Sequence, residues 1–257
     1  MGINKINIIT SFPKSGNTWM RFIVYDLLFN QDKININNSA EIKKKVPDIH
    51  DLKISNSQYI LDKSLVNEQI FIKTHFGYNQ LKMMPIDKVI IIIRHPFDVL
   101  ISLLNYYEIN DDQRDNMLNY FCSKHTLPFL EKKNFPNWEQ HLESWIDSGK
   151  DYHIVKYSNL IDDFENQVRD LCKFLKLEIP DEKIRFIKNN TKFENLKKIE
   201  IRERKNNLEG FFKDNMKDKK TNFINKGGYG NYKNFFNRYE QSKLEHSFKK
   251  ELEKFKL

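Results

Sequence analysis

Residues 89–93 form an unbroken run of valine and isoleucine, and this run limits the possible folds more than any other segment. A strand without a polar face has to be covered on both sides, which is typical of a central strand in a parallel sheet. We therefore predict a buried strand over residues 88–93. Because this is the longest strongly apolar run in the chain, we expect no membrane-spanning helix.

The rest of the chain alternates between strand-like and helix-like segments. β-Branched residues predict further strands over residues 5–10, 69–74 and 152–157. Apolar spacing and capping residues predict the helices. These cover 17–29, a segment opened by Pro96, two pieces of 112–148 broken near Pro128 and Pro136, a segment capped by Ser158, a segment opened by Pro180, and 238–255. The alternation predicts a single α/β domain over residues 1–257, with a central parallel sheet flanked by helices.

Two polar segments lack a clear period. Residues 30–58 are rich in asparagine and lysine, and we expect irregular structure over the sheet. Residues 197–220 are charged and aperiodic, so we expect a mobile loop there.

The net charge of +8 favours an anionic partner, although a solvated lysine-rich surface explains most of the lysines. The basic residues form no stripe interleaved with aromatic residues, which disfavours nucleic acid. Cys122 and Cys172 are too few for a disulfide scaffold and lack metal-binding spacing. The first ten residues lack the apolar centre of a signal peptide, so we expect a cytoplasmic protein with reduced thiols.

Three of the predicted strands end in chemically loaded segments. The first is followed by Lys14-Ser15-Gly16, the second by Lys73-Thr74-His75 and the third by Arg94. Ligands of parallel α/β sheets bind outside the carboxyl ends of the strands. These residues are therefore expected to meet at one site.

Residues 12–19 pass from a strand into a helix through a turn of small residues. The backbone N–H groups and the dipole at a helix start favour an anion, and Lys14 adds a full positive charge. Ser15, Asn17 and Thr18 add polar side chains. The lysine precedes the glycine, so this is not a Walker loop, and an ordinary capped turn is the alternative. We interpret the segment as a P-loop-like cradle for a phosphate or sulfate group.

The string Phe-Pro-Lys-Ser-Gly-Asn-Thr-Trp at residues 12–19 resembles the opening motif of the cytosolic-type sulfotransferases. That family uses 3′-phosphoadenosine 5′-phosphosulfate (PAPS). Five more segments follow in the family's order and are similar to Lys-Thr-His, Arg-Asn-Pro-Lys-Asp-Val, Tyr-Glu-Asp, Thr-Ser-Phe and Lys-Gly-x-x-Gly-Asp-Trp-Lys-Asn. They begin at Lys73, Arg94, Tyr157, Thr191 and Lys226. Six motifs in order make the resemblance specific.

The resemblance implies an enzyme that moves a sulfuryl group from PAPS to a hydroxyl or an amine, with PAP as the product and without a metal. It implies that His75 is the general base and that Lys14 and Lys73 stabilise the leaving oxygen. His141 matches a segment that lies near the acceptor in the family. Donor binding is implied for Lys14, Ser15, Gly16, Asn17, Thr18, Trp19, Arg94, Ser102, Tyr157, Thr191, Phe193, Lys226 and Gly227.

Each role has a structural alternative. Arg94 could form an ion pair with Asp98 in the next turn of chain. Tyr157 and Phe193 could be ordinary core aromatics, and core packing explains His141 at least as well as contact with an acceptor.

The chain departs from the family pattern at Asn225, where the family has an arginine before Lys-Gly. Asparagine cannot replace the bidentate phosphate contact of arginine. We expect weaker donor binding, or a substitute cation from residues 197–220. The dimer motif of animal members is not recognisable near residues 233–242, so the oligomeric state is not predicted.

Two other function classes were weighed. A P-loop-like kinase or hydrolase would need a lysine after the glycine and an acidic Mg²⁺ ligand at a strand end, and the third strand ends in Arg94 instead. A non-catalytic module that binds PAP, PAPS or acidic glycans would use the same basic groove. The loops expected to contact the acceptor are polar, which favours a polar small molecule or a saccharide.

Overall fold

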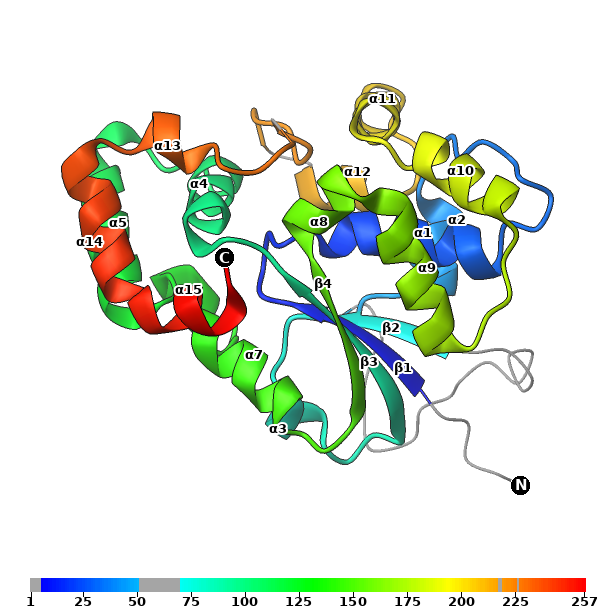
Figure 1. The fold of residues 1–257 in the computed structure, drawn as a ribbon. Helices are drawn as coiled ribbons and strands as arrows, with labels where there is room; N and C mark the ends of the chain where they lie inside the picture. The colour runs from blue at the N-terminus through cyan, green and yellow to red at the C-terminus, as the bar shows by residue number, and fades with distance from the viewer. Residues whose placement is uncertain (1–5, 51–69, 217–218, 226) are drawn as a thin grey trace.

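The run at residues 89–93 lies in an inner strand of a parallel sheet, as predicted. The computed structural model describes residues 6–50, 70–216, 219–225 and 227–257. Its four strands are parallel and lie in the order β2-β1-β3-β4 (Figure 1). They are β1 (Ile6–Ser11), β2 (Ile70–Thr74), β3 (Ile86–Ile93) and β4 (Asp151–Lys156). The single α/β domain with a central parallel sheet flanked by helices is thereby confirmed.

Strand β3 is buried on both faces because its side chains alternate between two cores. Val89 and Ile91 pack into one core, and Ile90 and Ile92 pack into the other. All four are fully buried. Burial of one such side chain contributes about 1.5–3 kcal/mol, so this strand fixes the centre of the domain.

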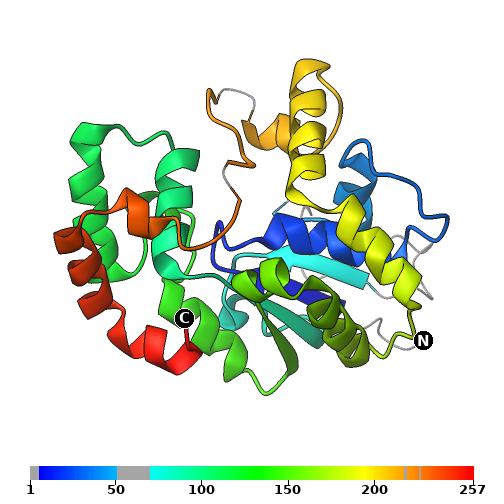
Figure 2. The ribbon, with the colours of Figure 1, turned by 45° about the horizontal axis from the view of Figure 1, so that its top comes forward.

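Helices cover the two faces of the sheet (Figures 1 and 2). One core joins the sheet to α1, α8, α9 and α10, and the other joins it to α4, α5, α7 and the C-terminal helices. The first set is α1 (Asn17–Leu28), α8 (Tyr157–Asp162), α9 (Phe164–Leu175) and α10 (Asp181–Asn190). The second set is α4 (Pro96–Tyr106), α5 (Asp111–Lys124), α7 (Trp138–Ile146), α14 (Arg238–Ser247) and α15 (Lys249–Phe255). The remaining short helices include α3 (Tyr78–Leu81), α6 (Pro128–Glu131) and α13 (Tyr232–Phe235).

Several helix predictions are confirmed with altered boundaries. Pro96 occupies the first turn of α4, and α10 begins directly after Pro180. The segment 112–148 holds three helices rather than two, because α6 forms a separate turn between the prolines. The C-terminal helix is broken at Phe248, which is fully buried between α14 and α15.

The prediction that Ser158 caps a helix is wrong. Strand β4 runs directly into α8, whose N-cap position is Lys156. The Ser158 hydroxyl lies 3.4 Å from the side-chain oxygen of Asn159. A break at Asp163 then separates α8 from α9.

The prediction of a mobile loop over residues 197–220 is also wrong. This segment contains most of α11 (Phe193–Lys205) and all of α12 (Phe211–Met216). The inner face of α11 carries Leu196 and Ile199 together with two buried carboxylates, Glu200 and Glu203. Because two of the buried positions are acidic, the spacing of the apolar residues alone does not show the helical period.

Residues 30–50 are not wholly irregular, since they include α2 (Ala40–Lys45). Its single fully buried side chain is Ile42, which explains the weak apolar period. The rest of the segment predicted to be irregular, residues 51–58, lies outside the described residues. Within the described part of the chain, no helix combines the length and the apolar character that a membrane crossing requires.

Candidate active site

The carboxyl ends of β1, β2 and β3 open into one cavity of about 810 Å³. The register aligns Thr10 with Thr74 and with Ile91, so the loops that follow start side by side. The volume is in the range of small-molecule sites. Most of the residues predicted from the sequence line this cavity: Lys14, Gly16, Asn17, Thr18, Trp19, Lys73, His75, Arg94, Ser102, Tyr157, Phe193 and Gly227.

The turn between β1 and α1 has an unusual backbone. Lys14 has φ of 65° and Gly16 has φ of 105°, both in the left-handed region. A Cβ at Gly16 would lie 2.6 Å from the ring of Tyr157, so only glycine fits there. Helix α1 begins at Asn17, and its first N–H groups have no partner within the helix. The sequence thus builds an anion cradle at the start of α1.

The ammonium group of Lys14 is buried without a hydrogen-bond partner. Its Nζ lies 3.5 Å from the ring centroid of Phe223 and 4.3 Å from that of Tyr106. Burial, followed by the nearby positive charge of Arg94, lowers the pKa of Lys14 to about 7. A buried ammonium group without a hydrogen-bond partner fits a site for an anionic ligand.

The polar side chains of the cradle differ in their surroundings. The Ser15 hydroxyl is buried without a partner, although Ser15 is not among the residues that line the cavity. The Asn17 amide donates to Ser11 Oγ at 3.2 Å and so ties the start of α1 to the end of β1. Thr18 is partly exposed and lines the cavity.

Arg94 lies at the end of β3 with its guanidinium group against the cradle. It donates to the Lys14 carbonyl at 3.1 Å and to the Gly228 carbonyl at 3.2 Å. The guanidinium carbon lies 4.4 Å from the ring centroid of Tyr157, and Nε is buried without a partner. The alternative ion pair with Asp98 is not formed, since both Asp98 oxygens accept backbone N–H groups.

The glycine-rich segment after residue 226 packs against the start of α4 and against Arg94. Asp98 accepts the N–H groups of Gly230 at 2.7 Å and Tyr232 at 3.2 Å. Gly227 has φ of 64°, and a Cβ there would lie 2.6 Å from the Phe193 ring. Lys226, which was predicted to contact the donor, lies outside the described residues.

Aromatic residues form one end of the cavity. The Trp19 ring meets Tyr157 edge to face at 5.6 Å and stacks on Phe164 at 6.1 Å. Trp19 Nε1 donates to Thr191 Oγ1 at 3.3 Å. Thr191 is fully buried and outside the cavity lining, so its described role is to orient Trp19.

His75 lines the same cavity and lies directly after β2. Its Nδ1 is 2.7 Å from the Ser11 carbonyl oxygen, which can only accept, so Nδ1 carries the proton. Nε2 therefore keeps its lone pair. Burial, followed by the charge of Lys73, holds the pKa of His75 well below its usual range. The imidazole is consequently neutral at pH 7.

Lys73 lies on β2, two residues before His75. Its Nζ donates to Asp48 Oδ2 at 2.6 Å. No pattern in the sequence singled out Asp48, because it lies in the segment expected to be irregular.

His141 is not part of the cavity lining. It is fully buried on α7, and its Nε2 is 2.9 Å from Thr10 Oγ1 on β1. Burial lowers its pKa to about 3. These surroundings are those of a residue packed in the core, which was the alternative to contact with the acceptor.

Several lining residues escaped the sequence reading. Beside His75, the rings of His50, Phe76 and Phe135 pack with centroids 4.7–5.6 Å apart. Phe223 and Tyr106 cover Lys14 at the other side. None of them lies in a motif. His50, Tyr106 and Phe135 lie in loops expected to contact the acceptor, whereas no signal in the sequence pointed to Phe76 or Phe223.

Asn225 lines the cavity at the position where the family has arginine. A substitute cation was expected from residues 197–220, and Lys219 does lie close enough to lower the pKa of Lys14. However, Lys219 Nζ donates to the Tyr106 carbonyl at 2.5 Å. Lys219 therefore adds charge near Lys14 without replacing the missing arginine contact beside Arg94.

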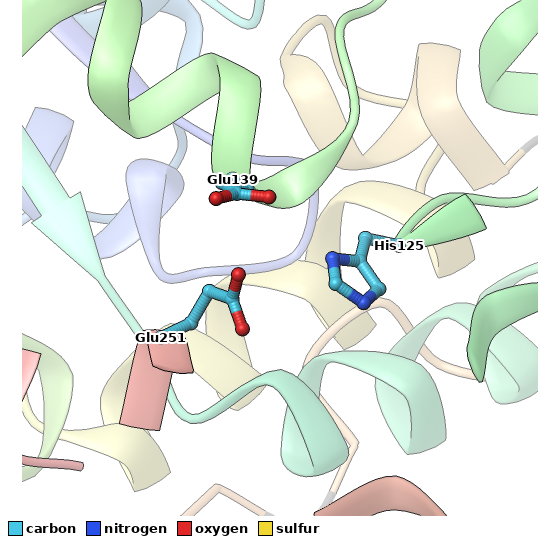
Figure 3. A group of neighbouring side chains, drawn as sticks. All are labelled: His125, Glu139 and Glu251. Carbon is cyan, nitrogen blue, oxygen red and sulfur yellow. The ribbon is translucent and has the colours of Figure 1, made fainter. Parts of the chain in front are cut away.

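One cluster of possible metal ligands lies outside this cavity. His125, Glu139 and Glu251 come from α5, α7 and α15 or their ends, with ligand atoms within 4.8 Å of one another (Figure 3). Lys250 Nζ lies 3.0 Å from Glu139 Oε1 and already supplies a positive charge. The three residues are far apart in the sequence, so no metal-binding motif could predict this cluster.

Comparison with known proteins agrees with this arrangement. A family profile described as a sulfotransferase domain matches residues 5–256. Sulfotransferase 1 family member D1 of Mus musculus is 26% identical over 96% of this chain and 83% of its own length. Amine sulfotransferase of Oryctolagus cuniculus is 23% identical over 97% of this chain and 81% of its own.

Solved structures share the fold. The crystal structure of mouse sulfotransferase SULT7A1 complexed with PAP superposes with a TM-score of 0.65. It is 18% identical, and the match covers 98% of this chain and 84% of that one. Because the family profile spans almost the whole chain and the P-loop-like cradle lies within it, the protein belongs to the sulfotransferase family.

Proposed function

We propose that the protein transfers a sulfuryl group from PAPS to a hydroxyl or an amine of a small-molecule or saccharide acceptor. The observation that carries this proposal is the buried, unpartnered ammonium group of Lys14 at the cradle. The positive charges of the motif residues Arg94 and Lys73 both act on this group and lower its pKa. The residues present therefore fit an anionic donor.

The donor would lie across the cradle. Lys14 and the first N–H groups of α1 would hold the 5′-phosphosulfate. Arg94 and Ser102 would hold the 3′-phosphate, since an arginine fork suits a phosphate group. Trp19, Tyr157 and Phe193 would enclose the adenine, which needs flat apolar surfaces.

When bound, PAPS supplies an activated sulfuryl group attached to a phosphate leaving group. His75 Nε2 takes the proton of the acceptor as the new bond to sulfur forms. Lys14 stabilises the negative charge that grows on the leaving oxygen, and Lys73 assists. The neutral His75 described above is in the protonation state that a general base needs.

The acceptor would occupy the end of the cavity beside His75. The rings of His50, Phe76 and Phe135 offer an edge for a ring-shaped acceptor, and Lys132 and Lys133 lie at the same cavity. We also propose a cytoplasmic location, in line with two free cysteines.

A transfer assay tests the proposal. Purified protein is incubated with labelled PAPS and a panel of phenols, alcohols, amines and saccharides, and PAP binding is followed by thermal shift. We expect a labelled product with at least one acceptor class, and stabilisation of about 2.7 kcal/mol at a PAP concentration of 100 Kd. PAP binding without transfer to any acceptor would favour the binding-module alternative, and transfer from Mg²⁺·ATP would favour the kinase.

A further inference from the structure

The carboxylate of Asp48 lies at the cavity without a role in the transfer described above. Its segment is fixed against β2, because Lys73 N donates to the Pro47 carbonyl and Ile49 N donates to the Lys73 carbonyl, each at 2.8 Å. This parallel bridge places the Asp48 side chain beside that of Lys73. Both side chains are largely buried, with exposed fractions of 20% and 10%.

Both oxygens of this carboxylate are engaged. Oδ2 accepts from Lys73 Nζ at 2.6 Å, and Oδ1 accepts from the His50 N–H at 3.1 Å. A charge-assisted hydrogen bond of this length between partly buried groups fixes both side chains. Asp48 and Lys73 thus form one rigid unit beside His75.

We propose that Asp48 is a positioning residue for sulfuryl transfer, which holds Lys73 in place and offsets the positive charge that His75 gains from the acceptor. This inference rests on the proposed function. The proton leaves the acceptor oxygen or nitrogen and arrives at His75 Nε2, while the acceptor–sulfur bond forms and the bond from sulfur to the phosphate oxygen breaks.

The charges around His75 explain why such a residue is needed. Burial and Lys73 both disfavour the imidazolium, as does His141 beneath the ring, whereas Asp48 and the Ser11 carbonyl favour it. Without a nearby negative charge, His75 would be a very weak base.

Asp48 itself stays ionised. Burial alone would raise its pKa, but Lys73, His75 and two hydrogen bonds together hold the pKa of Asp48 well below its usual range. Its negative charge is therefore present throughout the pH range in which the enzyme would work.

Asp48→Asn tests the inference, because the amide can still accept the His50 N–H while the charge is lost. On wild-type protein that transfers sulfate, we expect the plateau kcat to fall about tenfold. The pKa on the acid side of the kcat profile should move lower, and the KM for PAPS should change less than about twofold. Asp170→Asn is the matched control, because Asp170 pairs with Lys173 at 2.9 Å on the exposed face of α9. The kcat and KM of this variant should equal those of the wild type.

A second pair of variants separates charge from structure. In Lys73→Met/Asp48→Asn the opposing lysine charge is also absent, so the double variant should be faster than the product of the two single losses predicts. Asp48→Glu should recover part of the kcat. NMR titration of His75 in the PAP complex should show a lower pKa in Asp48→Asn than in wild type.

An unchanged His75 titration and an unchanged kcat profile in Asp48→Asn would overturn the inference. The inference would also be overturned if Asp48→Asn lowered kcat and thermal stability together without shifting the pH profile of kcat. Asp48 would then have only a structural role. Failure of the wild-type protein to transfer sulfate would instead refute the proposed function.

Discussion

The ring of Phe223 covers the ammonium group of Lys14, with Nζ 3.5 Å from the ring centroid. Phe223 is held in place by Glu200 on α11, which accepts the Phe223 N–H at 2.6 Å and the Ile224 N–H at 2.7 Å. Under this aromatic cover the ammonium group is buried without a hydrogen-bond partner, and Glu200 is the nearby negative charge that acts against the lowering of its pKa. Lys14 is therefore the residue whose charge should respond most to the donor.

The affinity for PAP should depend on pH through Lys14. Its pKa is about 7 in the empty site, and two phosphate groups nearby would raise it. At pH 8 binding should take up close to one proton, and the Kd should rise by up to about tenfold per pH unit above 7. Calorimetry in buffers of different ionisation enthalpy measures this uptake.

Lys14→Met should abolish the proton uptake and weaken PAP binding. Lys188, which pairs with Glu165 on the surface, provides the control substitution Lys188→Met. An uptake that persists in Lys14→Met would mean that another group titrates.

His75→Ala should lower kcat by about 10²–10⁴-fold, because a general base contributes that much. PAP binding, measured by calorimetry, should stay within about threefold of wild type. His246→Ala, on the exposed face of α14, should change neither quantity. Substantial turnover by His75→Ala would refute the assignment of the base.

Arg94→Ala should weaken binding of PAP much more than binding of AMP, which lacks the 3′-phosphate. A lost charge-assisted contact corresponds to about 1.5–3 kcal/mol, or roughly 10–150-fold in Kd. Arg169→Ala, at an exposed ion pair with Asp181, is the matched control. Equal losses for the two nucleotides would indicate a purely structural arginine that holds the Lys14 and Gly228 carbonyls.

Glu200→Ala should destabilise the fold by about 3 kcal/mol, since it leaves buried N–H groups without acceptors. It should also weaken PAP binding, because Phe223 would no longer be held over Lys14. Denaturant unfolding and calorimetry measure the two effects, and Glu194→Ala on the exposed side of the same helix is the control. A destabilised variant with unchanged Kd would separate Glu200 from the donor site.

The strand ends could be predicted from the sequence because the chemistry there is local. His75 and Arg94 directly follow β-branched runs, Lys14 lies in the turn after another such run, and parallel strands bring such ends together. The sheet was predictable for the same reason, since residues 89–93 permit burial on both faces. The alternation of strands and helices then fixed the class of fold.

The partners of those residues could not be predicted, because they depend on distant parts of the chain. Asp48 meets Lys73 through an isolated bridge of two residues, too short to leave a strand pattern. Glu200 looked like a solvated residue until the fold buried it under residues 223 and 224. For His141 the sequence left contact with the acceptor and core packing open, and the fold buries it against Thr10.

The two bonds from Asp98 to Gly230 and Tyr232 join parts of the chain more than 130 residues apart. These bonds join the turn between β3 and α4 to the glycine-rich segment, so we expect the two to behave as one cooperative unit. Arg94 adds a further link, because it donates to the Gly228 carbonyl. A chain shortened before residue 227 would therefore lose the part of the cavity lining that Gly227, Gly228 and Asn231 supply, as well as the three helices α13, α14 and α15. On donor binding, amide exchange should slow together in residues 94–102 and 227–232.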